Sequence, residues 1–223
     1  MTTKANRSRG MPRRSTAPST GRSRAPLLIG AGVIVLIVIA AIAAIVLSGG
    51  SSSGLAEPAN APIGVSGDPL PALSDPASDP AVGLAIPTIT GTDLAAEPMT
   101  IGPADGPAAI VLLAHWCSHC QVEVPVLVDF LATTGMPDGV ELVAISTSIN
   151  RAQPNYPPSA WLEREGWTPL TMVDDSSSRA LAALGMSSFP GFVFVDAEGR
   201  VVQRITGEIS ADAFAQIVES LAP

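Results

Sequence analysis

The chain contains two cysteines, Cys117 and Cys120, and the segment His115–Cys120 (HWCSHC) also holds both of its histidines. Thiols at this spacing can exchange a disulfide, form an inert one, or bind a soft metal ion. A closed zinc site needs four ligands, usually from two separated pairs, whereas these four side chains fall within six consecutive residues and cannot converge on one ion. We therefore favour disulfide exchange through a Cys117–Cys120 disulfide, and we predict neither a metal nor another cofactor.

The position of the two cysteines predicts their roles. Apolar residues have helical spacing from Cys117 to about Thr134, so Cys117 would stand at a helix start, where unpaired N–H groups and the helix dipole favour a thiolate. We expect Cys117 to be the nucleophile and Cys120, one turn further, to resolve the mixed disulfide. His119 lies between them as a cationic or hydrogen-bonding partner, which is expected to lower the pKa of Cys117 and make the pair more oxidising.

The surrounding sequence predicts an α/β domain. Continuous apolar runs typical of buried strands alternate with helical patterns, and the chain closes with a hairpin and an amphipathic helix. We therefore expect a mixed central sheet with helices on both faces. The predicted strands lie within residues 85–101, 108–116, 139–149, 169–175 and 191–207, and the predicted helices lie within 117–134, 176–186 and 210–222, with a short one begun by Ser159 as its N-cap.

Two segments carry a resemblance to a known family. LLAHWCSHCQVEVPVL resembles the active-site segment of the thioredoxin superfamily. SSFPGFVFVDAEGRVVQRITG resembles the segment that follows it in the TlpA/ResA/DsbE-like branch of membrane-anchored extracytoplasmic thiol-disulfide oxidoreductases. The resemblance runs from about Ile86 to the C-terminus and implies a thioredoxin-like fold. It includes a proline five residues after the second cysteine, Pro125, which would kink the active-site helix as a structural feature.

The same resemblance implies roles for other residues. Cys117 would attack, Cys120 would resolve, and Trp116 would flank the disulfide. Pro190, which precedes an apolar strand, would follow a cis peptide bond and lie against the disulfide. The backbone of Phe189 would then pair with the substrate chain, although packing in the core is an equally good interpretation of this residue.

The chain also departs from the superfamily pattern. Cytoplasmic thioredoxins carry a buried proton-accepting aspartate six residues before the first cysteine, and Val111 stands there instead. Glu123, three residues after Cys120, is the candidate replacement, but we favour the alternative that it lies on a solvated helix face. His115 is expected at the exposed end of the strand, with a role in tuning Cys117 as the weaker interpretation.

Two related chemistries fit the sequence poorly. A peroxiredoxin would need a proline and a threonine where Ile110 and Ala114 stand. A copper chaperone of the Sco type would need three residues between its cysteines and a distant histidine, and no histidine follows His119.

The sequence before the domain divides into three parts. Residues 1–26 form a basic tail that carries seven of the twelve basic residues. Residues 27–47 (Leu27–Leu47) are uncharged and long enough to cross a bilayer, so we predict a retained transmembrane helix rather than a cleaved signal peptide. Because basic residues precede it and none follows until Arg151, the N-terminus is expected on the cytoplasmic side of the membrane.

Residues 48–84, rich in Ser, Gly and Pro, are predicted to be a disordered linker, and 85–223 to be the thioredoxin-like domain.

Charge and compartment limit the function. From residue 48 onward the chain has five arginines against twenty acidic residues, which argues against nucleic acid and anionic lipid as partners. We predict an extracytoplasmic thiol-disulfide oxidoreductase that acts on cysteines of exported proteins and uses a membrane thiol redox partner. Oxidation is slightly favoured, because Ser-His resembles the x-His pair of dedicated oxidants. The alternatives are a reductant for cytochrome c maturation, a non-catalytic copper- or haem-handling module, and a redox-inactive interaction domain.

Overall fold

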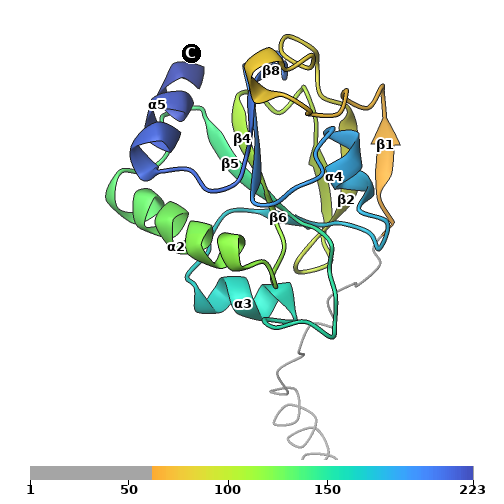
Figure 1. Ribbon diagram of the computed structural model, residues 1–223, viewed down its shortest axis with the longest axis vertical. Helices are drawn as coiled ribbons and strands as arrows, with labels where there is room; N and C mark the ends of the chain where they lie inside the picture. The colour runs from red at the N-terminus through yellow and green to blue at the C-terminus, as the bar shows by residue number, and fades with distance from the viewer. Residues whose placement is uncertain (1–61, 223) are drawn as a thin grey trace, which may run out of the picture. The chain divides into compact units, whose positions relative to one another are not determined.

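The computed structural model describes residues 62–222 of the chain (Figure 1). The predicted basic tail, the predicted membrane helix Leu27–Leu47 and the first part of the predicted linker lie outside these residues. Within residues 62–222, no helix is both long and apolar enough to cross a membrane.

A mixed eight-stranded sheet forms the centre of the domain, in the order β1-β2-β6-β5-β4-β7-β8, with β3 paired to β2. The strands are β1 (Gly64–Ser66), β2 (Thr88–Asp93), β3 (Pro98–Ile101), β4 (Ala108–Leu113), β5 (Glu141–Ser146), β6 (Thr171–Val173), β7 (Gly191–Val195) and β8 (Val201–Thr206). The helices are η1 (Pro76–Ser78), α2 (Ser118–Thr133), α3 (Pro158–Arg164), α4 (Arg179–Ala183) and α5 (Ala211–Leu221). Strands β4, β5 and β6 are parallel and the other pairs are antiparallel.

Helices cover both faces of the sheet, as predicted. Every residue of β4 is buried, and because side chains alternate along a strand, neighbouring residues serve opposite faces. Val111 and Leu113 belong to a cluster with residues of α2, α3 and α5. Ile110 and Leu112 belong to a second cluster, with residues of α4 and of the segment before β2. Figure 1 shows α2 and α5 on one side of the sheet and α4 on the other.

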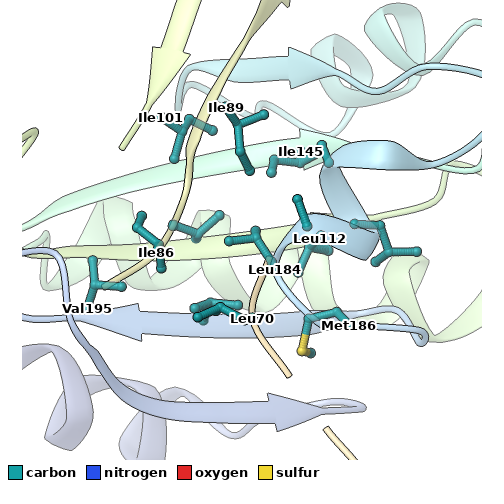
Figure 2. Packing of buried hydrophobic residues seen from close by; sticks show 14 of the residues in the cluster. Leu70, Ile86, Ile89, Ile101, Leu112, Ile145, Leu184, Met186 and Val195 are labelled. Atoms are coloured by element: carbon teal, nitrogen blue, oxygen red, sulfur yellow. The ribbon is translucent and has the colours of Figure 1, made fainter. Parts of the chain in front are cut away.

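The prediction of a disordered linker is wrong for residues 62–84. Ile63, Leu70 and Ala81 are buried in the second cluster, with 2%, 5% and 0% of their surfaces exposed. Figure 2 shows Leu70 between apolar side chains of the domain. These apolar residues are sparse and follow no helical or strand period, so the composition of the segment concealed its packing.

A buried arginine fastens this segment to the sheet. Arg204 of β8 is 1% exposed, and its Nε and Nη2 groups donate to the carboxylate of Asp79. Its Nη1 group donates to the carbonyls of Pro71, at 2.9 Å, and Leu184, at 2.8 Å. The guanidinium also holds the pKa of Asp79 below its usual range. Gly185 has a φ of +65°, and a Cβ there would lie 2.3 Å from the Pro71 oxygen, so only glycine fits.

The start of one element differs from its prediction. Helix α3 begins at Pro158 and has Pro157 as its N-cap, so Ser159 lies inside the helix. A proline at the first helical position costs no hydrogen bond and has a fixed φ, which favours the earlier start.

Candidate active site

Strand β4 and helix α2 together position the two cysteines. The chain leaves β4, and Cys117 becomes the N-cap of α2, as predicted, with φ and ψ of −75° and 122°. Both thiols are free. Cys117 is half-buried whereas Cys120, on the first turn of the helix, is fully buried. The two sulfurs therefore differ in access, since only Cys117 reaches the surface.

The environment of Cys120 opposes its ionisation. Its Sγ accepts a hydrogen bond from the Ala114 N–H at 3.4 Å. Burial raises the pKa of the Cys120 thiol far above its usual range; the Ala114 N–H lowers it, while Cys117 and Glu123 raise it further. This thiol needs a proton acceptor before it can attack as a thiolate.

The segment before β7 lies against the accessible sulfur. The Phe189–Pro190 peptide bond is cis, which confirms the expectation for Pro190. The Cys117 thiol donates to the Phe189 carbonyl at 3.5 Å. Phe189 is half-buried and meets Trp116 edge to face, with ring centroids 5.3 Å apart. The Trp116 indole in turn donates to the Ser148 carbonyl at 2.8 Å. These contacts place an aromatic pair beside the cysteine.

Glu123 is buried, so our preference for a solvated helix face is wrong. Its side chain belongs to the inward-facing side of α2, and 1% of the residue is exposed. One carboxylate oxygen, Oε2, accepts from the Ile209 N–H at 2.9 Å, while Oε1 is buried without a hydrogen-bond partner. Burial raises the pKa of Glu123 to about 7; the Ile209 N–H lowers it, and Glu208 raises it.

The buried carboxyl group of Glu123 lies on α2, whereas β4 has no acidic residue. Val111 is completely buried and belongs to the same cluster as Cys120. The buried acid therefore comes from the helix rather than from the strand. Its charge influences the pKa of Cys120, which indicates that the two groups interact.

His119 has a partner that sequence analysis missed. Its Nδ1 lies 2.7 Å from the Oε1 of Glu208, and the two side chains are 70% and 41% exposed. Glu208 belongs to the loop between β8 and α5 and is 89 residues away along the chain. No local motif marks this residue, because its importance follows only from the tertiary contact.

His115 does not lie at an exposed strand end, which corrects that expectation. It is completely buried. Its Nδ1 lies 2.7 Å from the Pro154 carbonyl, and its Nε2 accepts from the Asn150 N–H at 3.2 Å. Burial lowers the pKa of His115, against the Pro154 carbonyl, which raises it. Both ring nitrogens hold the loop after β5, so neither is available to Cys117.

The remaining predicted residue lies within the active-site helix. Helix α2 runs from Ser118 to Thr133 with Pro125 inside it. Proline has no N–H and cannot donate to the carbonyl of Gln121, four residues earlier. The kink expected at Pro125 stays a prediction.

The arrangement can perform two-step sulfur chemistry. An accessible thiol at a helix start is backed by a buried thiol and by a buried carboxyl group with one free oxygen. Among residues 62–222, no group of three or more His, Cys, Asp and Glu side chains is placed to hold a metal ion.

Comparison with known proteins agrees with this geometry. The family of thioredoxin-like domains matches residues 99–222. Thiol-disulfide oxidoreductase ResA of Geobacillus thermodenitrificans is 30% identical over 108 residues, which cover 48% of this chain and 59% of that protein. ResA of Geobacillus kaustophilus is 27% identical over 144 residues, covering 64% and 79%. The chain thus spans about three-fifths of the length of the first relative.

Solved structures show the same fold. The thioredoxin domain of a thiol-disulfide oxidoreductase from Bacteroides vulgatus is 21% identical, with a TM-score of 0.52 over 64% of this chain and 99% of that one. A DsbF homologue from Corynebacterium diphtheriae is 18% identical, with a TM-score of 0.51 over 61% and 86%. At these identities the likeness concerns the fold alone, which is thioredoxin-like α/β.

Proposed function

The chain belongs to the family of thioredoxin-like domains, and from this premise we propose that it catalyses thiol-disulfide exchange through Cys117 and Cys120. The observation that carries the proposal is the unequal burial of the two thiols. Cys117 is half-buried at the start of α2, beside the cis peptide of Pro190, and Cys120 is fully buried behind it. An attacking thiol must be reachable, whereas a resolving thiol needs to reach only its neighbour.

The exchange proceeds in two steps. The Cys117 thiolate attacks one sulfur of a substrate disulfide, forms a mixed disulfide and displaces the other substrate sulfur as a thiolate. Cys120, after losing its proton, attacks the Cys117 sulfur and releases the second substrate sulfur. The two protein thiols become one disulfide, and two electrons and two protons pass to the substrate. Read backwards, the same steps oxidise a substrate dithiol.

Glu123 is proposed as the proton acceptor for Cys120. Its Oε1 is buried without a partner, so this oxygen is free to receive the proton. A carboxyl group whose pKa is about 7 exchanges protons readily at neutral pH. Burial of both groups keeps the transfer away from bulk solvent.

The substrate chain is proposed to lie along Phe189. Its carbonyl already contacts the Cys117 sulfur, so an extended peptide at this backbone would bring its own cysteine to the same place. The half-buried rings of Phe189 and Trp116 offer an apolar border. A predicted groove role and a predicted packing role are thus compatible in one residue.

The proposed setting is the outer side of the cytoplasmic membrane. The support is the uncharged segment Leu27–Leu47, preceded by a basic tail. The substrates would then be exported proteins with cysteines, and a membrane thiol carrier would exchange electrons with the pair. The preference for oxidation depended on His119, and Glu208 now supplies an opposing charge beside it. We therefore propose the exchange chemistry in either direction, with the reduction potential deciding between them.

The experiment is turnover of insulin disulfides by the purified full chain in the presence of dithiothreitol. We expect catalysed reduction that disappears in Cys117→Ser. Cys120→Ser is the matched control, because the same substitution three residues later should leave the first attack intact and accumulate mixed disulfides on non-reducing gels. Stoichiometric copper or haem binding without turnover would contradict the proposal and support a binding module.

A further inference from the structure

Three consecutive residues, Gly207–Ile209, contact three separate parts of the site. The Gly207 N–H donates to the carbonyl of Pro190 at 2.8 Å. The Glu208 carboxylate lies 2.7 Å from His119, and the Ile209 N–H donates to the carboxylate of Glu123 at 2.9 Å. This segment joins β8 to α5, so it connects the cis-proline region, the second of the two residues between the cysteines and the buried acid.

Only the middle residue of the segment brings a charge. The other two contacts are made by backbone N–H groups, which any residue except proline could supply. Glu208 is the acidic partner of His119, and its charge also acts on Glu123. The titratable groups with which it interacts are thus His119 and Glu123.

A charge next to His119 changes what that histidine can do. A lone imidazolium near a thiolate stabilises it and makes a cysteine pair more oxidising. A carboxylate in contact with the same ring opposes this effect, because its charge has the opposite sign. When the ring carries its proton, the charges of the paired side chains sum to zero.

We propose that Glu208 is a positioning residue that sets the redox poise of the cysteine pair, by holding His119 and offsetting its charge. The protein is then less oxidising than its Ser-His dipeptide alone implies. This inference rests on the proposed redox role of Cys117 and Cys120, and it adds a residue that acts through His119 without touching the substrate. The other possibility, a purely structural link between α2 and the loop before α5, predicts no change in potential.

The test is a set of four reduction potentials, measured by equilibrating the full chain with glutathione buffers at pH 6 and low salt. The variants are Glu208→Gln, His119→Gln and the double variant. Glu208→Gln should be more oxidising, with an equilibrium constant changed about threefold, which corresponds to about 14 mV for this two-electron couple. His119→Gln leaves an unpaired carboxylate and should shift the constant in the opposite direction. The double variant should return close to the unmodified protein.

Further readouts separate an electrostatic role from a structural one. The pH at which Cys117 begins to react with iodoacetamide should fall in Glu208→Gln and rise in His119→Gln. High salt should reduce all of these shifts, since both side chains are exposed. Glu219→Gln, an exposed position on α5, is the matched control and should leave the potential unchanged.

Equal potentials in all four proteins, or single variants that shift in the same direction, would overturn the inference. Its failure is distinct from failure of the proposed function. Glutathione equilibration requires no protein substrate, so Glu208→Gln and His119→Gln can shift the potential in opposite directions even if insulin turnover is absent. Insulin turnover can equally be present when the two variants leave the potential unchanged.

Discussion

Two buried charged side chains lie on opposite faces of the sheet, and their surroundings differ. Arg204 donates to Asp79 and to two backbone carbonyls. Glu123 has one oxygen bonded to the Ile209 N–H and the other without a partner. Arg204 fixes a segment of chain, whereas Glu123 retains an open position for a proton. The comparison indicates that incomplete hydrogen bonding, rather than burial itself, distinguishes a chemical group from a structural one here.

The two sites also shift the pKa values of their carboxyl groups in opposite directions. The pKa of Asp79 is lowered by its hydrogen bonds with Arg204, so this ion pair stays charged at neutral pH. Burial raises the pKa of Glu123 to about 7, so this carboxyl group changes its charge near neutral pH. The Arg204–Asp79 pair is therefore insensitive to pH near neutrality, where the charge of Glu123 changes.

The largest expected effect comes from breaking the paired charge. Arg204→Met leaves the buried Asp79 carboxylate unpaired and should lower the free energy of unfolding by about 3–5 kcal/mol, measured by urea unfolding at pH 7. Arg179→Met, at an exposed arginine whose side chain is 54% exposed, is the control and should cost less than about 1 kcal/mol. Replacing both partners, as Arg204→Met with Asp79→Leu, should recover much of the loss. Equally small losses of stability in Arg204→Met and Arg179→Met would contradict a structural role for Arg204.

The next effect has the opposite sign and depends on pH. In the unfolded chain Glu123 loses its proton near the usual pKa of 4.5, whereas in the folded chain it keeps the proton up to about pH 7. The free energy of unfolding should therefore fall as pH rises through this window. Glu123→Gln removes that loss and should be more stable than the unmodified protein at pH 8 by about 3 kcal/mol, with no difference at pH 4. Thermal unfolding at both pH values measures the difference, and Glu219→Gln serves as the exposed control. A constant difference at the two pH values would contradict the raised pKa.

A smaller effect is expected on the second chemical step. Without the Glu123 carboxylate, Cys120 loses its proton acceptor, and the lifetime of a mixed disulfide on Cys117 should increase at least about tenfold at pH 7. In the unmodified protein this step should accelerate as pH rises through about 7, where Glu123 becomes ionised. Stopped-flow resolution of a fluorescent mixed disulfide gives both quantities. Unchanged rates in Glu123→Gln would contradict the proposed role of Glu123 as proton acceptor and would leave it a structural role only.

The smallest effect concerns the exposed pair. His119→Gln and Glu208→Gln should each change the unfolding free energy by less than about 1 kcal/mol, because the side chains are 70% and 41% exposed. Chemical unfolding at pH 7 is the measurement. A larger loss in either variant would show that the His119–Glu208 pair stabilises the fold, as Arg204 is expected to do.

The sequence predicted the parts of the site that local motifs encode. Cys117 and Cys120 at a helix start and the strands around them follow from spacing and from apolar runs, whereas the cis bond before Pro190 follows from the resemblance to the thioredoxin superfamily. Glu208 and Ile209 could not be predicted, because they reach α2 across 86 to 89 residues of chain. The bonding of such distant polar groups depends on tertiary placement, which no local period records.

Burial was the other quantity that sequence patterns conveyed poorly. Glu123 and His115 are polar residues beside a surface-reaching cysteine, so exposure was the expected state, yet both are enclosed. The segment 62–84 reads as a linker because eight of its 23 residues are proline or glycine. A few well-placed side chains and one arginine on the last strand, β8, suffice to hold it.

The hydrogen bonds between Arg204 and the segment before β2 determine where this protein can be truncated. A shortened chain that starts at Ile86, where the resemblance begins, would lose Asp79 and strip β1 from β2. One that starts at Met99, where the family match begins, would lose β2 as well. Either fragment would present the apolar face around Leu184 to water and is expected to aggregate during expression. A fragment from Pro62 onward retains this cover and is the one suited to crystallisation.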